Sequence, residues 1–217
     1  MGARLYGRCR SLTAQVSRRV LSSVLPHVPV SLRCRMIPVL RFAFGFQISA
    51  RAVAAARDRL VGGGNLLVFG IGLDSSTWEL VNRRGRTVFL GDVPGWVDIS
   101  NGEAPGREVH LVAYATTVET SMGISESTQV PLPVLPDDVA STPWDVVVVD
   151  GPAGWGAETP GRAASITLAH GLVRRGGLVL VDDYGRPVER HVCDLVFGRP
   201  ADELLDPSRP VALFRSS

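Results

Sequence analysis

The feature that most constrains the fold of this chain is a run of four consecutive valines within residues 144–149. Continuous β-branched runs are typical of strands buried on both faces in the middle of a parallel sheet. Four further short apolar runs predict strands at residues 65–69, 87–90, 108–112 and 178–181. Helical spacing predicts intervening helices at residues 74–82, 162–174 and 188–197, the second of them closed by Gly176-Gly177. Strands that alternate with helices predict right-handed crossovers and a doubly wound α/β fold.

The flanks of this region also have interpretable patterns. Residues 49–61 predict a helix, with Ser49 as its N-cap and three glycines at 62–64 that end it. Residues 201–205 and 210–215 predict two closing strands joined by a Pro-Ser turn. We therefore expect a helical N-terminal extension at residues 1–48 and a main domain at residues 49–217.

The length and composition are those of an ordinary globular protein with one α/β domain. The chain has 217 residues, of which 45% are hydrophobic and 20% charged, which excludes a disordered or collagen-like chain. Three scattered cysteines are too few for a disulfide framework or a zinc site. No segment reaches the ~18–20 uninterrupted apolar residues of a membrane span, and no secretory signal is recognisable. We expect a cytoplasmic location.

The charges are distributed unevenly along the chain. All 23 basic residues are arginine, and ten of them precede Asp58, which is the first acidic residue. Such a split is found in arms that bind nucleic acids or membrane surfaces, and in helical caps that dock on an acidic domain. An apolar stripe at helical spacing in residues 11–25 favours docking. We expect residues 1–48 to form part of the wall of the acceptor pocket or part of a homodimer interface, and we expect no nucleic-acid partner.

The first strand and the second strand both end in residues suited to ligand binding. The first ends in a turn with Gly70, Gly72 and Ser75, where two glycines allow close backbone approach and a helix N-terminus follows. A dinucleotide fingerprint requires a third glycine where Ser75 stands, which argues against a pyrophosphate. Asp92 follows the second strand, about 20 residues later, where a carboxylate can accept hydrogen bonds from ribose hydroxyls. This pairing fits a dinucleotide or S-adenosylmethionine.

Several segments in one collinear order resemble the plant glucuronoxylan 4-O-methyltransferase family. They are residues 67–78, 85–90, 113–116, 135–139, 144–145, 150–155 and 159–163. The resemblance covers roughly residues 50–200 and implies a class I methyltransferase fold, whose seven-stranded, mostly parallel sheet ends in an antiparallel hairpin. It also implies that the domain at 49–217 binds S-adenosylmethionine, with Gly70, Gly72, Ser75 and Asp92 in the cofactor site.

Three more carboxylates follow neighbouring strands of the predicted sheet. Asp150 comes after the fourth strand, and Asp182 and Asp183 come after the fifth. Unpaired carboxylates repel one another, which favours a divalent cation between them. The three residues are also similar to the metal triad of cation-dependent O-methyltransferases, including those that modify macrolide sugars. We expect one divalent cation, with Mg²⁺ as the ion, bound by all three; the alternative is that Asp150 touches the cofactor and Asp182 or Asp183 caps a helix.

The expected chemistry is an in-line displacement in which an acceptor hydroxyl attacks the sulfonium methyl. A cation on the acceptor would position hydroxyls and lower their pKa. We expect Asp150 and Asp183 to be catalytic. The sequence leaves the proton acceptor open among Asp183 and the histidines His110, His170 and His191. Two aromatic residues, Trp155 and Tyr184, lie in the loops after the fourth and fifth strands. We expect them either to stack on a sugar or to cover the hydrophobic core.

These expectations combine into one function with named alternatives. The chain is expected to be an S-adenosylmethionine-dependent O-methyltransferase. Because the plant enzymes are membrane-anchored and act on a polymer, whereas this shorter sequence shows no anchor, the expected acceptor is a hydroxyl of a small sugar or glycoside. The alternatives are an RNA methyltransferase that uses the Arg-rich arm and a non-catalytic S-adenosylmethionine-binding protein. A nicotinamide oxidoreductase is disfavoured by Ser75 and by the lack of any lysine.

Overall fold

The computed structural model describes residues 49–199, 201–205 and 210–217. The predicted extension at residues 1–48 lies outside the described residues, and so does the predicted Pro-Ser turn, which falls within residues 206–209. The domain boundary and the docking of the Arg-rich arm therefore stay predictions.

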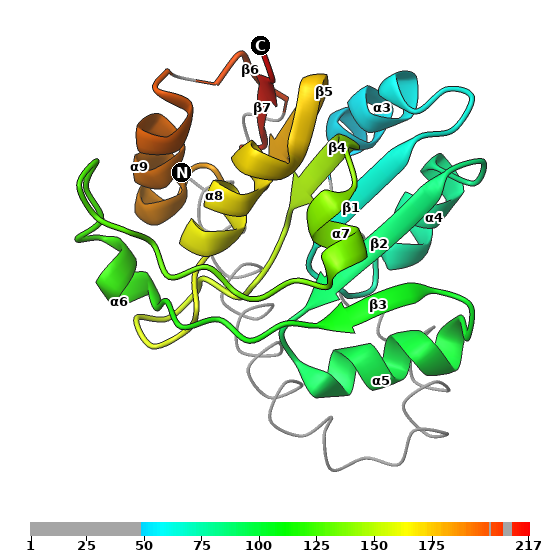
Figure 1. Cartoon of the computed structure of the whole chain (residues 1–217), viewed down its shortest axis with the longest axis horizontal. Helices are drawn as coiled ribbons and strands as arrows, with labels where there is room; N and C mark the ends of the chain where they lie inside the picture. Colours follow the sequence, from blue (N-terminus) through cyan, green and yellow to red (C-terminus); the bar gives the residue numbers. More distant parts are fainter. Residues whose placement is uncertain (1–48, 200, 206–209) are drawn as a thin grey trace, which may run out of the picture.

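Seven strands of the described residues form a single sheet, in the order β3-β2-β1-β4-β5-β7-β6 (Figure 1). The strands are β1 (Asn65–Phe69), β2 (Arg86–Gly91), β3 (Glu108–Leu111), β4 (Trp144–Val149), β5 (Val173–Val181), β6 (Glu203–Leu204) and β7 (Ala212–Arg215). The first five are parallel, and β7 runs antiparallel to both β5 and β6. This arrangement confirms the mostly parallel seven-stranded sheet with a closing antiparallel hairpin that the resemblance implies.

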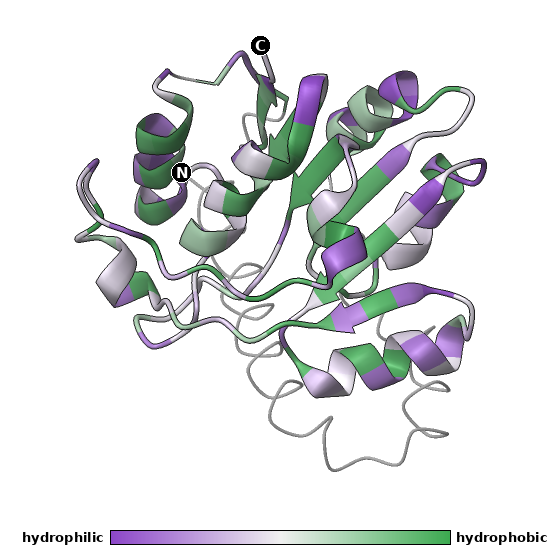
Figure 2. Cartoon of the chain, in the orientation of Figure 1, coloured by the Kyte–Doolittle hydropathy of each residue, from purple (hydrophilic) through white to green (hydrophobic). Residues whose placement is uncertain are grey.

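The valines of β4 explain why this strand occupies the middle of the sheet. Val147 and Val149 face one hydrophobic cluster, and Val146 and Val148 face the other, so both surfaces of the strand are buried. Branched side chains pack well on such a doubly covered surface. Trp144 begins the strand, is fully buried, and donates its indole N–H to the carbonyl of Val139 at 3.0 Å. Figure 2 shows that the central strands are hydrophobic over most of their length.

Helices cover both faces of the sheet. One face packs against α3 (Ala50–Arg59) and α4 (Ser75–Val81), and the other against α7 (Asp137–Ser141), α8 (Ala163–Leu172) and α9 (Pro187–Phe197). Two further helices are α5 (Pro94–Glu103), which contacts β2 and β3, and the short α6 (Val118–Ser121). In the part of the chain that is described, no helix combines the length and hydropathy needed to cross a bilayer.

One prediction about local structure was wrong, and one helix was not predicted. The predicted helix at residues 162–174 ends at Leu172, and Gly176-Gly177 lies inside β5 instead of closing a helix. The reason is long-range pairing, since Val173 already pairs with Trp144 of β4. Helix α5 was missed because its sequence, with a proline, two glycines and an asparagine, has low helix propensity.

Candidate functional site

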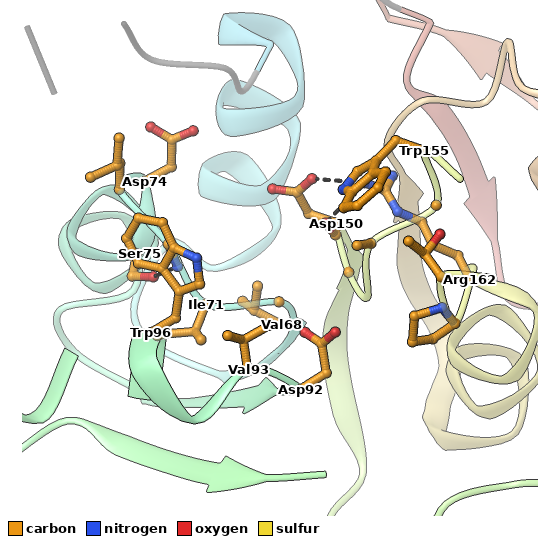
Figure 3. A pocket seen from close by; sticks show the side chains of 18 of the residues that line it. Val68, Ile71, Asp74, Ser75, Asp92, Val93, Trp96, Asp150, Trp155 and Arg162 are labelled. Atoms are coloured by element: carbon orange, nitrogen blue, oxygen red, sulfur yellow. Dashed lines mark hydrogen bonds and ion pairs between the residues drawn. The ribbon is translucent and has the colours of Figure 1, made fainter. Parts of the chain in front are cut away.

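A cavity of about 350 Å³ lies at the carboxyl ends of β1, β2 and β4. Open α/β sheets bind ligands at this edge. Figure 3 shows side chains from the loops after β1 and β2 on one side of the cavity and side chains from the loop after β4 on the other. Five of the predicted site residues line it, namely Gly70, Gly72, Ser75, Asp92 and Asp150.

The turn after β1 brings main chain close to the cavity. Gly70 has φ +121°, a conformation that side-chain-bearing residues rarely adopt, and a Cβ there would lie 3.2 Å from the carbonyl carbon of Asp150. Gly72 is different, because a Cβ added to it would meet no atom within 4 Å. The N–H of Gly72 donates to the hydroxyl of Ser75 at 3.0 Å, which fixes the turn. Main chain at Gly72 is therefore open to a ligand.

Asp92 follows β2 and points into the lower part of the cavity as drawn in Figure 3. Its side chain is half-buried, and a backbone N–H of Ala153, in the loop after β4, hydrogen-bonds to its carboxylate. Burial raises the pKa of Asp92 above its usual value, while that hydrogen bond and the charge of Arg162 act in the opposite direction. The carboxylate is thus held in place by protein groups and faces the cavity.

A buried arginine organises the other wall of the cavity. Arg162 comes just before α8, and only 3% of its side chain is exposed. One terminal nitrogen, Nη2, donates to the carbonyl of Asp150 at 2.9 Å and lies 3.2 Å from Oδ1 of the same residue and 3.1 Å from Oδ2 of Asp183. The other, Nη1, donates to the carbonyl of Asp182 at 2.5 Å and lies 3.8 Å from its Oδ2. All three predicted metal ligands therefore surround one guanidinium.

Charges in this cluster compensate each other. Burial lowers the pKa of Arg162, but the charges of Asp183, Asp150 and Asp182 outweigh burial and hold that pKa above its usual value. Burial, together with the charge of neighbouring Asp150, raises the pKa of Asp182 to about 8. The raised pKa of Asp182 thus reflects its buried position beside two other carboxyl groups.

The predicted metal site is not supported. The prediction assumed that Asp150, Asp182 and Asp183 are unpaired, and this assumption is wrong because Arg162 forms an ion pair with each of them. Among the described residues, no group of three or more His, Cys, Asp or Glu side chains is arranged to hold a metal ion. The donor set, which already surrounds a guanidinium, therefore does not fit a divalent cation.

The remaining candidates divide between the cavity and the rest of the domain. Asp150 lines the cavity and its side chain is 30% exposed, whereas Asp183 is absent from the described cavity lining and pairs with Arg162 and with Arg186. The role of Asp183 as a base stays a prediction. Trp155 lines the cavity, while Tyr184 is buried in the core against Phe214.

The three histidines considered as proton acceptors lie outside the described lining of the cavity. His110 is near Glu108 on β3, with 3.5 Å between Nε2 and Oε1. His170 packs its ring edge-on against Phe197. Nε2 of His191 lies 2.7 Å from the carbonyl of Ile124. His170 and His191 therefore make their contacts elsewhere in the domain, and Nε2 of His110 is buried on β3 without a hydrogen-bond partner among the described residues.

Two functional candidates were missed by the sequence reasoning. Arg162 and Arg186 both line the cavity; Arg162 contacts the acids after β4 and β5, and Arg186 contacts Asp183 after β5. A usable signal was present, because buried carboxylates require a counter-charge and Arg162 stands in one of the segments that carry the family resemblance. Spacing alone does not indicate which arginine reaches them.

Comparisons with curated proteins identify polysaccharide methyltransferases as relatives. Glucuronoxylan 4-O-methyltransferase 2 of Arabidopsis thaliana is 36% identical, over 58% of this chain and 50% of that protein. Arabinogalactan O-methyltransferase 1 of the same plant is 32% identical, over 58% of this chain and 52% of that protein. The chain thus spans about half the length of the curated relatives it matches.

The fold and the family are both supported by these comparisons. The O-methyltransferase TomG of Streptomyces achromogenes, solved with bound cofactor, superposes with a TM-score of 0.50 at 16% identity, covering 85% of this chain and 90% of that one. This likeness supports the class I methyltransferase fold. The sequence profile of the IRX15/IRX15L/GXM family matches residues 51–129 and 119–197, which together span most of the described domain. The chain therefore belongs to the IRX15/IRX15L/GXM family.

Proposed function

We propose that this chain is an S-adenosylmethionine-dependent O-methyltransferase that methylates a hydroxyl of a sugar unit in a polysaccharide. The observation that carries the proposal is a cavity that the Gly70–Gly72 turn and Asp92 line on one side and Asp150 lines on the other. The names of the relatives, a glucuronoxylan and an arabinogalactan methyltransferase, support a polymeric carbohydrate as the acceptor. They replace the expectation of a small free sugar or glycoside.

The residues of the cavity fit S-adenosylmethionine. The main chain at Gly72 is open where a side chain would otherwise stand, so it can approach a ligand closely. The carboxylate of Asp92 is suited to accept hydrogen bonds from ribose hydroxyls. Asp74 and Asp92 place two carboxyl groups in the lining, where they can interact with the positively charged groups of the cofactor. When bound, the cofactor supplies a methyl group made electrophilic by its positively charged sulfur.

Asp150 is the proposed proton acceptor. Its carboxylate faces the cavity, and Arg162 fixes its orientation through both the carbonyl and Oδ1. Asp150 would accept the proton of the acceptor hydroxyl as that oxygen takes up the methyl group, and the electron pair of the broken carbon–sulfur bond would stay with the cofactor. Holding the acceptor oxygen in line, and accepting its proton, are the two tasks of the protein in such a reaction.

The proposal is tested by direct methyl transfer. The full chain is incubated with S-adenosylmethionine labelled in its methyl group and with glucuronoxylan, arabinogalactan, or the corresponding free monosaccharides. We expect label to enter a polymer and to be located on a sugar hydroxyl by mass spectrometry of the hydrolysed product. Calorimetry with S-adenosylmethionine accompanies the assay. If the cofactor binds but no carbohydrate is labelled, the acceptor class is wrong, and if the cofactor does not bind, the whole proposal fails.

Replacing Asp92 is expected to weaken cofactor binding. In the Asp92→Ala variant the dissociation constant for S-adenosylmethionine should rise by an amount that corresponds to ~1.5–3 kcal/mol, because charge-assisted hydrogen bonds to the ribose are lost. Titration calorimetry measures this change. Asp92→Asn, which keeps an oxygen for the N–H of Ala153, should show a smaller loss. Wild-type affinity in a folded Asp92→Ala protein would remove Asp92 from the cofactor site.

Trp155 is expected to contribute to acceptor binding. Its ring lies on the β4 side of the cavity, near Asp150, and can stack on the apolar face of a sugar (Figure 3). Trp155→Ala should raise the KM for the polysaccharide by roughly 2- to 10-fold with little change in the affinity for S-adenosylmethionine. Trp96→Ala is the matched control, because Trp96 lines the opposite side next to Asp92 and should affect the cofactor instead. An unchanged KM in Trp155→Ala would contradict this assignment.

A further inference from the structure

Arg162 stands where the acids at the ends of two neighbouring strands converge. Gly161, with φ +68°, turns the chain immediately before it, and α8 begins immediately after it. The side chain is directed back to the ends of β4 and β5 and is 3% exposed. Burying a guanidinium carries a large desolvation cost unless its donors are paired, so a buried arginine with several partners indicates a specific structural task.

The contacts of Arg162 join main chain as well as side chains. Its two terminal nitrogens donate to the carbonyls of Asp150 and Asp182, which are the first residues after β4 and β5. Nη2 also donates to the carboxylates of Asp150 and Asp183. A planar guanidinium can hold several acceptors in fixed directions at once, and a lysine ammonium cannot reproduce that geometry. Arg162 thus ties the two strand ends together and orients the carboxylate that faces the cavity.

A divalent cation and this guanidinium would compete for the same oxygens. A cation bound by Asp150, Asp182 and Asp183 would have to lie within a few ångströms of the positive charge of Arg162, which is buried, and like charges repel. Removal of Arg162 would leave Asp150 and Asp182 without this counter-charge, and Asp183 with Arg186 alone. The cluster would then have the composition of an oxygen-rich site for Mg²⁺ or Mn²⁺.

We propose that Arg162 is the internal counter-ion of this site: it occupies the position that the sequence suggests for a divalent cation and positions Asp150 for proton transfer. Arg162 is a positioning residue, because it acts through Asp150. The part about Asp150 rests on the proposed function, whereas the part about the counter-ion concerns the protein alone and can be tested without any transfer reaction.

The first experiment measures metal binding in the absence of substrate. The full chain, freed of metal by chelation, is titrated with Mn²⁺, whose free concentration is followed by electron paramagnetic resonance. We expect no saturable binding to the wild type and one saturable site per chain in Arg162→Met. Arg107→Met is the matched control, since Arg107 is also buried and also pairs with carboxylates, of Glu79 and Glu103, but lies outside the described lining of the cavity. A saturable Mn²⁺ site in the wild type that disappears in Asp150→Asn would overturn the proposal.

The second experiment separates positioning from simple loss of stability. In Arg162→Met we expect kcat to fall at least about 100-fold, because a displaced catalytic group loses its alignment, while the dissociation constant for S-adenosylmethionine changes less than about threefold. Arg162→Lys keeps the charge without the planar fork, so it should fold, bind no Mn²⁺, and recover only part of kcat. If Arg162→Met does not fold, the wild-type titration and Arg162→Lys decide the question. Full kcat in Arg162→Lys, or activity of the wild type that is lost on chelation and restored by Mg²⁺, would contradict the proposal.

Failure of the proposed function gives a different result. If no carbohydrate is methylated by the wild type, the kcat comparison is replaced by the Mn²⁺ titrations, which still support or overturn the role of Arg162 as a counter-ion. The two hypotheses are therefore tested by separate measurements.

Discussion

The Asp150→Asn variant is expected to lose methyl transfer almost completely and to keep its fold and its cofactor. Asparagine has the shape of aspartate and retains an oxygen that can accept from Nη2 of Arg162, as Oδ1 does in the wild type at 3.2 Å. It cannot accept a proton from a sugar hydroxyl. Removing a general base costs typically 10²- to 10⁴-fold, so kcat should fall by about that factor. Steady-state kinetics with the best polysaccharide acceptor, and calorimetry with S-adenosylmethionine, measure the two effects.

Two further variants define how specific this loss is. Asp137→Asn removes an exposed carboxylate in the first turn of α7, outside the described cavity lining, and should have wild-type kinetics. Asp183→Asn removes a partner of Arg162 and Arg186 that is not part of that lining, so its kcat should fall less than that of Asp150→Asn. If Asp183→Asn were the more severe variant, Asp183 would be the base and the assignment of Asp150 would be wrong.

The sequence predicts the centre of the fold well because burial on both faces leaves a strong local pattern. The limits of β1 and β4 agree with the predicted runs at 65–69 and 144–149, since both strands are continuous apolar segments between turn residues. Less of α5 could be predicted, because Pro94, Gly95 and Gly102 give it little intrinsic helix preference. Its contacts with β2 and β3 form only in the folded chain.

The boundary between α8 and β5 also could not be predicted from local sequence. Gly176-Gly177 is typical of a helix end, and the local sequence gives no sign that Val173 pairs with the first residue of β4. The register shifts between Trp144 and Val146, so β5 reaches further back than its own apolar run. Long-range pairing, which no local window contains, decides where the helix stops.

For the candidate site, the position of acids after parallel strands was predictable, but their partners were not. Because the carboxyl ends of parallel strands share one edge of the sheet, these acids were expected to lie close together. The structure has Asp92 and Asp150 in the lining of one cavity, and Asp182 and Asp183 in one cluster with Asp150. This rule gives no information on which basic residues pair with these acids. Their actual partner, Arg162, reaches them from the loop before α8, and this contact depends on the path of that loop in three dimensions.

The two glycines of the turn after β1 are expected to respond differently to the same substitution. In Gly70→Ala, an alanine would have to adopt φ +121°, and its Cβ would lie 3.2 Å from main-chain atoms of Asp150 and Gly151. The free energy of unfolding should therefore fall by about 1–3 kcal/mol. In Gly72→Ala the Cβ meets no protein atom within 4 Å and the backbone is not in the left-handed region, so stability should be unchanged.

The effect of Gly72→Ala should therefore appear in cofactor binding alone. If the open space at Gly72 is where main chain approaches S-adenosylmethionine, a methyl group there displaces the ligand, and the dissociation constant should rise at least about tenfold, which corresponds to ~1.4 kcal/mol. Gly106→Ala is the matched control, because a Cβ at Gly106 also meets nothing within 4 Å and the residue lies outside the described cavity lining. Thermal unfolding and calorimetry on the three variants separate strain from steric exclusion. Wild-type affinity in Gly72→Ala would mean that the cofactor does not contact this turn, and the cofactor site would then have to lie on another part of the sheet edge.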